Sequence, residues 1–181
     1  MKRTIHNPVL GDTVAFVRTA EESHGAITEL EATVMPGGSN PPHFHRTYDE
    51  IFTMLEGSLR LESPKGVQMD LRPGGKYVVK AGQVHSFLNI SSAPARIRTQ
   101  IIPGNEGFEN SLRILYGLAS DGLYHRQRKA PRSFEHLAVC MSMSDTCLAG
   151  PLSCLNRLFR LAAIFARWRG VETRLVLTYC Q

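Results

Sequence analysis

The hydrophobic pattern of the chain changes its period near residue 103, and this change constrains the fold more than any other sequence feature. Before residue 103, short apolar or alternating runs recur about every ten residues, separated by Gly, Pro, Asn and Ser, which is typical of a β-sandwich or barrel. The runs that predict strands are Val14–Arg18, Ala26–Val34, Ile51–Leu55, Ser58–Leu61, Val67–Leu71, Tyr77–Val79, Ser86–Ile90 and Arg96–Ile102.

After Pro103, apolar residues recur every three to four positions, which predicts helices. The first helical pattern runs from Phe108 to Leu118, with Asn105 able to cap its start and Gly122 just past its end. Two further patterns are Phe134–Met141, after Pro131, and Leu152–Arg169, which Gly170 closes. We therefore expect a β domain over residues 1–103 and a helical extension over 104–181, packed on that domain or on a second subunit.

Composition excludes several classes of protein. A chain of 181 residues with 43% hydrophobic and 20% charged residues allows one packed domain with an extension, and is too apolar for disorder. Residues 1–112 carry a net charge of −1 and residues 113–181 a net charge of +6. The basic part has neither zinc-finger spacing nor the aromatic-basic pattern of RNA binders, so we expect no nucleic-acid partner.

The first twelve residues lack the apolar core of a secretory signal, and no stretch is apolar enough to span a membrane, so we expect a cytoplasmic protein. The four cysteines, Cys140, Cys147, Cys154 and Cys180, form no disulfide or Cys-x-x-Cys pattern. In that compartment we expect buried, reduced thiols.

Histidines and one glutamate form the most informative pattern. His43 and His45 lie two apart, so on a strand both imidazoles point to the same face and can converge on one ion. Glu50 reaches that face only if the chain turns around residues 46–49, and a neighbouring strand could bring in His85. A His-x-His pair alone is expected by chance in roughly 0.3 of such chains, but adding Glu50 and Gly57 lowers this to about 0.001.

These two segments resemble the two motifs of the cupin superfamily. The first motif, Gly-x5-His-x-His-x4-Glu-x6-Gly, is matched at every position by Gly37, His43, His45, Glu50 and Gly57. The second, Gly-x5-Pro-x-Gly-x2-His-x3-Asn, is matched by Gly74, Gly82, His85 and Asn89, with Lys80 in place of the usual proline. The short spacer, residues 58–73, is similar to that of compact single-domain bacterial cupins, and the helical extension resembles those of some quercetin-dioxygenase-like cupins.

The resemblance implies a mainly β fold, a double-stranded β-helix or jelly-roll cupin barrel, with a C-terminal α-helical extension. It also implies one divalent metal ion (Fe, Mn, Ni, Cu or Zn) held by His43, His45, Glu50 and His85. Such a metal polarises an oxygen substrate or brings substrate and O₂ together. Our hypothesis is that Glu50 doubles as a general base when it leaves the metal. We expect dioxygenase-like chemistry on a small organic molecule; a non-catalytic small-molecule binding cupin and a metal-dependent isomerase or decarboxylase are the alternatives.

Strand parity suggests which residues form the substrate pocket. Phe87 and Asn89 share the parity of His85, and Phe52 and Met54 share that of Glu50. The alternative for Phe52, Met54 and Phe87 is plain core packing, because apolar residues fill small barrels. Tyr48 lies beside the ligand loop and could donate a hydrogen bond to substrate, although a surface position is as plausible. Arg98 and Gln100 would bind a carboxylate if their side of the strand lines the barrel; the alternative is that they face solvent.

The last predicted helix carries Asn156, Arg157, Arg160 and Arg167 on about a third of its circumference, with apolar residues over much of the rest. A basic amphipathic helix can lie on an anionic membrane, but more often it packs on its own domain or on another subunit. We therefore expect a homodimer and keep peripheral membrane contact as the less favoured alternative.

Overall fold

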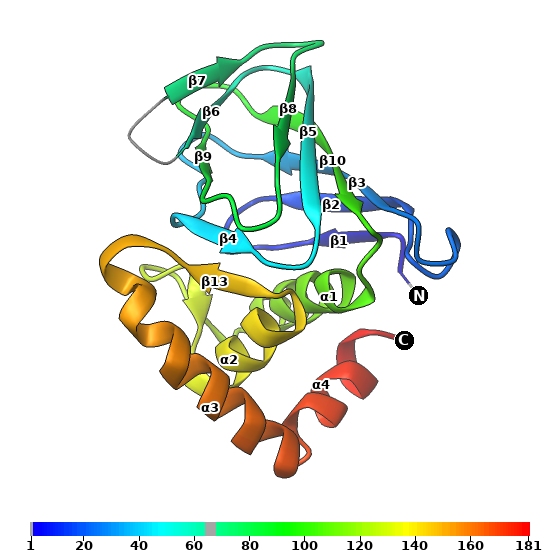
Figure 1. The fold of residues 1–181 in the computed structure, drawn as a ribbon, viewed down its shortest axis with the longest axis vertical. Coiled ribbons are helices and arrows are strands. Elements are labelled where there is room, and N and C mark those ends of the chain that lie inside the picture. The colour runs from blue at the N-terminus through cyan, green and yellow to red at the C-terminus, as the bar shows by residue number, and fades with distance from the viewer. Residues whose placement is uncertain (1, 64–67) are drawn as a thin grey trace.

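The computed structural model describes residues 2–63 and 68–181, and Figure 1 shows strands in the first part of the chain and helices in the second. The first ten strands are antiparallel to their neighbours. They are β1 (Thr4–His6), β2 (Thr13–Arg18), β3 (Thr28–Val34), β4 (His43–His45), β5 (Asp49–Glu56), β6 (Leu59–Glu62), β7 (Gln68–Leu71), β8 (Lys76–Val79), β9 (Ser86–Leu88) and β10 (Ala95–Ile102).

The sequence predicts most of these strands to within two residues. The expected strand Val67–Leu71 is seen as β7, and its first residue, Val67, lies outside the described residues. Strand β1 was not expected, because three residues give too short a pattern to recognise.

Two sheets enclose the hydrophobic core of the β part of the chain. One has the strand order β1-β2-β3-β10-β5-β8 and the other the order β7-β6-β9. Side chains from both sheets form a single apolar cluster, in which Phe52, Met54 and Ile97 of the larger sheet pack with Leu59 and Leu61 of the smaller one. Two facing antiparallel sheets are the arrangement expected for a jelly roll, whose closure into a barrel stays a prediction.

Strand β10 shows how alternation divides the larger sheet into an inner and an outer face. Ile97, Thr99 and Ile101 are buried, whereas Arg98 and Gln100 point to the other side. The register pairs Arg98 with Glu31 on β3, and the guanidinium donates to that carboxylate at 2.7 Å.

The helices are α1 (Glu106–Ser120), α2 (Phe134–Met143), α3 (Asn156–Trp168) and α4 (Val171–Tyr179). Asn105 caps α1 as expected, its side-chain oxygen accepting from the backbone of Phe108 at 2.8 Å. The predicted helix Leu152–Arg169 begins as a 3-10 helix, η1 (Gly150–Leu155), and becomes α-helical only at Asn156. Helix α4 was not predicted, because Gly170 ends α3 in the left-handed conformation and another helix follows at once.

The helical part also contributes short strands. Strands β11 (Tyr124–His125) and β12 (Ala130–Pro131) form a hairpin in the basic connector. Strand β13 (Thr146–Leu148) pairs antiparallel with β4, the strand that carries both histidines, and Figure 1 shows it crossing between the helices and the sheets. The two parts of the chain therefore share one ladder of backbone hydrogen bonds.

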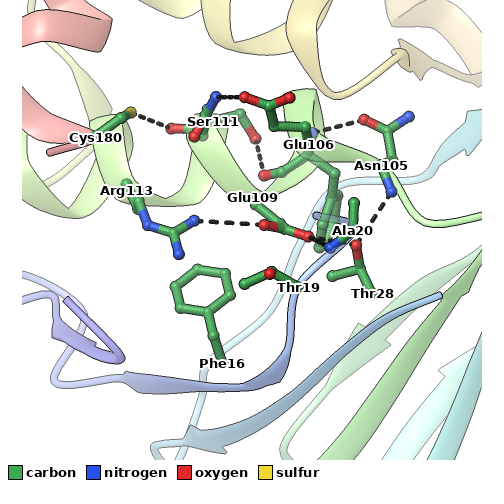
Figure 2. A network of polar contacts seen from close by, with 12 residues as sticks. Phe16, Thr19, Ala20, Thr28, Asn105, Glu106, Glu109, Ser111, Arg113 and Cys180 are labelled. Carbon is green, nitrogen blue, oxygen red and sulfur yellow. Dashed lines mark hydrogen bonds and ion pairs between the residues drawn. The ribbon is translucent and has the colours of Figure 1, made fainter. Parts of the chain in front are cut away.

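A buried polar network fixes α1 against the larger sheet (Figure 2). The Glu109 carboxylate accepts from the backbone of Ala20 at 2.6 Å and from the hydroxyl of Thr28 at 2.5 Å. It also lies 3.8 Å from the guanidinium of Arg113, which stacks over the Phe16 ring at 3.8 Å. This carboxylate thus joins the β2–β3 connection, β3 and α1, with both charged side chains buried.

All four cysteines are free, but the expectation that they are buried is correct only in part. Cys140 is buried in the helical core, Cys147 and Cys180 are half-buried, and Cys154 is exposed on the 3-10 helix. Among the described residues, no helix is both long enough and apolar enough to cross a membrane.

Candidate metal centre

The candidate centre is assembled by three short backbone contacts. The backbones of His43 and His85 form an isolated antiparallel bridge, with N–O distances of 3.0 and 2.8 Å. The backbone N–H of Gly82 donates to the carbonyl of His45 at 2.6 Å, and Gly82 adopts φ +80, which favours glycine. The two motifs, far apart in the sequence, are thereby held against each other at the level of their histidines.

Lys80 replaces a proline in the second motif, and the structure gives this residue a different bracing role. Its ammonium donates to the Asp49 carboxylate at 2.7 Å, and the backbone N–H of Ala81 donates to the same carboxylate at 2.9 Å. Together these bonds lower the pKa of Asp49 below its usual range. The turn of the second motif is thus tied to the first residue of β5, next to Glu50.

His43, His45, Glu50 and His85 are brought together as one cluster, here called the ligand cluster. All four side chains are buried, and one potential ligand atom from each lies within 4.8 Å of the others. Oε2 of Glu50 is 3.0 Å from Nε2 of His85 and 3.6 Å from Nε2 of His45. The turn at residues 46–49, which the parity of Glu50 requires, is present between β4 and β5.

The outer nitrogen of each histidine has its own partner, which orients the ring. Nδ1 of His43 donates to the Pro41 carbonyl at 2.9 Å, and Nδ1 of His85 donates to the Gln83 carbonyl at 3.2 Å. Because carbonyl oxygens only accept, both rings carry their proton on Nδ1 and present the Nε2 lone pair to the cluster when neutral. Such bonds to the remote nitrogen are typical of metal-bound histidines.

Tyr48 performs the same task for His45. Its hydroxyl donates to the Ser144 carbonyl at 2.7 Å and lies 2.7 Å from Nδ1 of His45, so it accepts the imidazole proton. Burial raises the pKa of Tyr48, which keeps the hydroxyl protonated. The predicted contact of Tyr48 with substrate is replaced by this contact with His45, because the ring is buried behind the imidazole.

The protonation states suit a cation. Burial, aided by the neighbouring His85 and His45, lowers the pKa of His43 to about 4, and burial also lowers the pKa of His45. For Glu50, burial raises the pKa, but the hydrogen bond and charge of His85 outweigh it, so the pKa lies below its usual range. An ionised Glu50 carboxylate therefore faces the neutral imidazoles of His43 and His45.

The donor set fits one divalent metal. Ligand atoms bound at about 2.1 Å can stand at most about 4.2 Å apart, so the observed limit of 4.8 Å requires only a small inward adjustment. Three imidazoles and one carboxylate suit a borderline ion such as Fe, Mn, Ni, Cu or Zn.

A cavity of about 290 Å³ opens beside the ligand cluster, and we call it the apolar cavity. His43, His45 and Glu50 form part of its wall, and Phe52 and Phe87 line it as the sequence predicts. Helix α1 supplies Phe108, Leu112 and Leu115, which the sequence pattern placed on a helix without linking them to the site.

Four other residues predicted to line the pocket lie elsewhere. Met54 is buried in the core between the sheets, and the Asn89 amide donates to the Val34 and Ala93 carbonyls. Arg98 and Gln100 are on the outer face of β10, bonded to Glu31 and Glu29 respectively, because Ile97 and Thr99 occupy the inner face. The condition for Arg98 and Gln100 to bind a substrate carboxylate, that their side of the strand lines the barrel, is therefore not met, and they take the alternative position on the outer face.

Asp145 is a supporting residue that the sequence did not reveal. Its carboxylate accepts from the backbone and guanidinium of Arg46, at 2.8 and 2.7 Å, and from the Thr47 hydroxyl at 3.0 Å. Burial raises the pKa of Asp145, but the bonds from Arg46 and Thr47 bring it below the usual range. Asp145 thus fixes the turn between His45 and Glu50 from a point almost a hundred residues along the chain.

Comparison with known proteins adds a family match. Residues 30–101, which contain the whole ligand cluster, match the family profile described as "Cupin domain". This match and the strand-rich architecture support the resemblance to the cupin superfamily and a mainly β cupin fold with C-terminal helices.

Two curated plant proteins are similar over part of the chain. The chain is 31% identical over 91 residues to Germin-like protein 4-1 of Oryza sativa subsp. japonica, covering 45% of this chain and 36% of that protein. It is 28% identical over 92 residues to Probable germin-like protein subfamily 2 member 5 of Arabidopsis thaliana, covering 49% and 43% respectively. The chain thus spans less than half the length of either relative.

Among solved structures, the polyketide cyclase RemF from Streptomyces resistomycificus is 26% identical in sequence. The alignment has a TM-score of 0.46 and covers 50% of this chain and 64% of RemF.

Proposed function

Starting from the match of residues 30–101 to the cupin domain, we propose that this chain is a metal-dependent enzyme. We further propose that it carries out dioxygenase-like chemistry on a small organic molecule. The observation that carries the proposal is the orientation of the three histidines. Their Nδ1 atoms are occupied by Pro41, Tyr48 and Gln83, and one potential ligand atom of each lies within 4.8 Å of the Glu50 carboxylate. His43, His45 and Glu50 also form part of the wall of the apolar cavity.

A bound divalent metal supplies the positive charge that polarises an oxygen atom of the substrate. The chain's own residues hold and orient the reactants. Phe52, Phe87 and Phe108 exclude water from one side of the substrate, and Glu50 serves as general base. The low pKa of Glu50 keeps its carboxylate ionised, as a proton acceptor must be.

The lining of the apolar cavity favours an uncharged substrate. Among the described residues that line it, no lysine or arginine is present, and its acidic side chains are Asp12 and Glu50. The charge of the metal is already offset in part by Glu50, and a dicarboxylate or sugar phosphate would find no cationic side chain to balance its remaining negative charge, which is unfavourable. We therefore propose a mainly apolar molecule with oxygen donors, such as a flavonol or a diketone, in keeping with the quercetin-dioxygenase-like resemblance.

The test combines metal analysis with oxygen uptake. Protein loaded separately with Fe(II), Mn(II), Ni(II) or Cu(II) is offered flavonols, diketones and oxalate, and O₂ consumption is followed with product analysis. We expect one stoichiometric metal per chain, and O₂ uptake with a flavonol or diketone but none with oxalate.

Two variants make this test specific. His85→Ala is expected to lose the metal. Glu50→Gln is assayed at full metal occupancy, and we expect it to keep the metal but to lose turnover. This result would separate the role of Glu50 as a base from its role as a metal ligand. Turnover without O₂ would favour the isomerase or decarboxylase reading. Ligand-induced thermal stabilisation without turnover would favour a binding protein; either result overturns the oxygen chemistry.

A further inference from the structure

Helix α3 has two apolar faces, and only one of them is covered. Phe159 and Ala163 pack against Ala138 of α2, and Ala166 joins the helical core. On the other side Leu158, Leu161, Ile164, Phe165 and Trp168 are each at least half exposed, and Trp168 is 81% exposed. We call these five side chains the outer stripe.

The outer stripe is continuous along the helix. Leu158, Leu161, Phe165 and Trp168 follow the three- and four-residue spacing that places side chains on one side of a helix. In Figure 1, α3 lies at the margin of the helical part, away from both sheets. Because the inner face of α3 already supplies its packing, the outer stripe needs a separate explanation, and contiguous exposed apolar patches of this kind mark interaction surfaces.

The unpaired charges of α3, around the outer stripe, are positive. Between Asp145 and Glu172 the chain contains four arginines and no acidic residue. Arg167 and Arg169 pair with Glu172 and Glu135, whereas Arg157 and Arg160 have no ion pair within residues 2–63 and 68–181. Arg157 precedes Leu161 by four residues, so the unpaired positive charge lies on the same side as the stripe.

We propose that the outer stripe docks this protein on an anionic lipid surface. Apolar side chains that include Trp, flanked by arginines, are the composition of helices that lie in the plane of a membrane interface. Thirteen residues of α3 extend only about 20 Å, which suits lying on a bilayer rather than crossing it. The competing occupant, a second copy of the same stripe, would bring a second set of arginines to the same interface, and like charges oppose that contact.

Trp168 allows a direct test because it is the sole tryptophan of the chain and lies in the outer stripe. The full chain is titrated with vesicles of phosphatidylcholine containing phosphatidylglycerol, and with vesicles of phosphatidylcholine alone. We expect the emission of Trp168 to shift to the blue, and to be quenched by brominated acyl chains, only with the anionic vesicles. Flotation of the protein with the same vesicles measures partitioning independently.

Two double variants separate the apolar and the charged contributions, and both leave the reporter in place. Leu161→Gln with Ile164→Gln is expected to weaken partitioning about tenfold or more. Arg157→Gln with Arg160→Gln removes two charges at about fivefold each, so we expect about a 25-fold loss. The matched control, Arg126→Gln with Arg128→Gln, removes the same charge from the exposed connector and is expected to change partitioning little.

The proposal is overturned by any of four results. Equal binding to neutral and anionic vesicles, or an equal loss in the control variant, removes the role of the arginines at the stripe. A blue shift that depends on protein concentration without lipid, with a doubled mass in light scattering, assigns the stripe to a dimer. No spectral change with anionic vesicles excludes docking through α3. Circular dichroism of each variant confirms that the helices are retained.

Discussion

The hydroxyl of Tyr48 lies 2.7 Å from Nδ1 of His45 and donates to the carbonyl of Ser144 at the same distance. One phenol therefore connects a predicted metal ligand to the end of α2, two residues before strand β13. This arrangement makes Tyr48 a positioning residue for His45.

Tyr48→Phe tests this role. We expect metal affinity to fall about tenfold or more, because the imidazole loses the group that fixes its orientation and proton position. Competition with a chromogenic chelator measures the affinity. The control is Tyr179→Phe, which removes an exposed hydroxyl bonded to Asp121 at 2.7 Å and is expected to leave the affinity unchanged. Equal affinity in Tyr48→Phe and the wild type would contradict the positioning role.

Glu109→Ala tests the network of Figure 2. The variant leaves the Arg113 guanidinium buried without its charge partner, which is expected to lower the free energy of unfolding by about 3–5 kcal/mol. Urea denaturation measures the change. Glu106→Ala, three residues earlier on α1, removes an exposed carboxylate and is expected to cost less than about 1 kcal/mol. If both variants lose the same stability, the network does not hold α1 to the sheet.

The ionised Asp145 carboxylate is expected to make the stability of the fold sensitive to acid. Its folded-state pKa lies below the usual value, so its contribution to stability is present at neutral pH and is lost as the pH falls below about 4. Asp145→Asn should lower the Tm at pH 7 and flatten the dependence of Tm on pH in that acid range. Calorimetry between pH 3 and pH 7 measures both effects. The exposed Asp70, paired with Arg60, gives a matched control in which Asp70→Asn changes the Tm little.

The four thiols should differ in reactivity. Burial raises the pKa of Cys140 to about 12 and that of Cys180 to about 11, whereas Cys154 is exposed. With iodoacetamide at pH 8 we expect Cys154 to be alkylated first and Cys140 last, as followed by peptide mass spectrometry. In urea all four should react at similar rates. Early labelling of Cys140 in the folded protein would show that the helical core opens readily.

Local patterns in the sequence predict the elements that local physics determines. Alternation identifies β10, the capping side chain of Asn105 identifies the start of α1, and the two histidine motifs identify the ligand cluster. In each case the signal lies within a few residues, because strand parity, helix caps and turns depend on neighbours in the chain.

Long-range pairing accounts for what the sequence could not predict. Nothing near Thr146 indicates that its strand will pair with His45, and nothing near Asp145 indicates that it will accept from Arg46. For Arg98 a signal was present: Glu29 and Glu31 alternate on a neighbouring strand with the same parity. Opposite charges facing each other across β3 and β10 would have placed Arg98 on the outer face.

The pairing of β4 with β13 means that the helical part covers one edge of the strand that carries His43 and His45. A shortened chain ending near residue 103 would leave the backbone of residues 43–45 as a bare strand edge, ready to recruit foreign strands. Deuterium exchange at the amide of Phe44, the residue of β4 that pairs with Cys147, would consequently report on unfolding of the helical part. Unfolding of the helical part would then also release a metal bound by the ligand cluster.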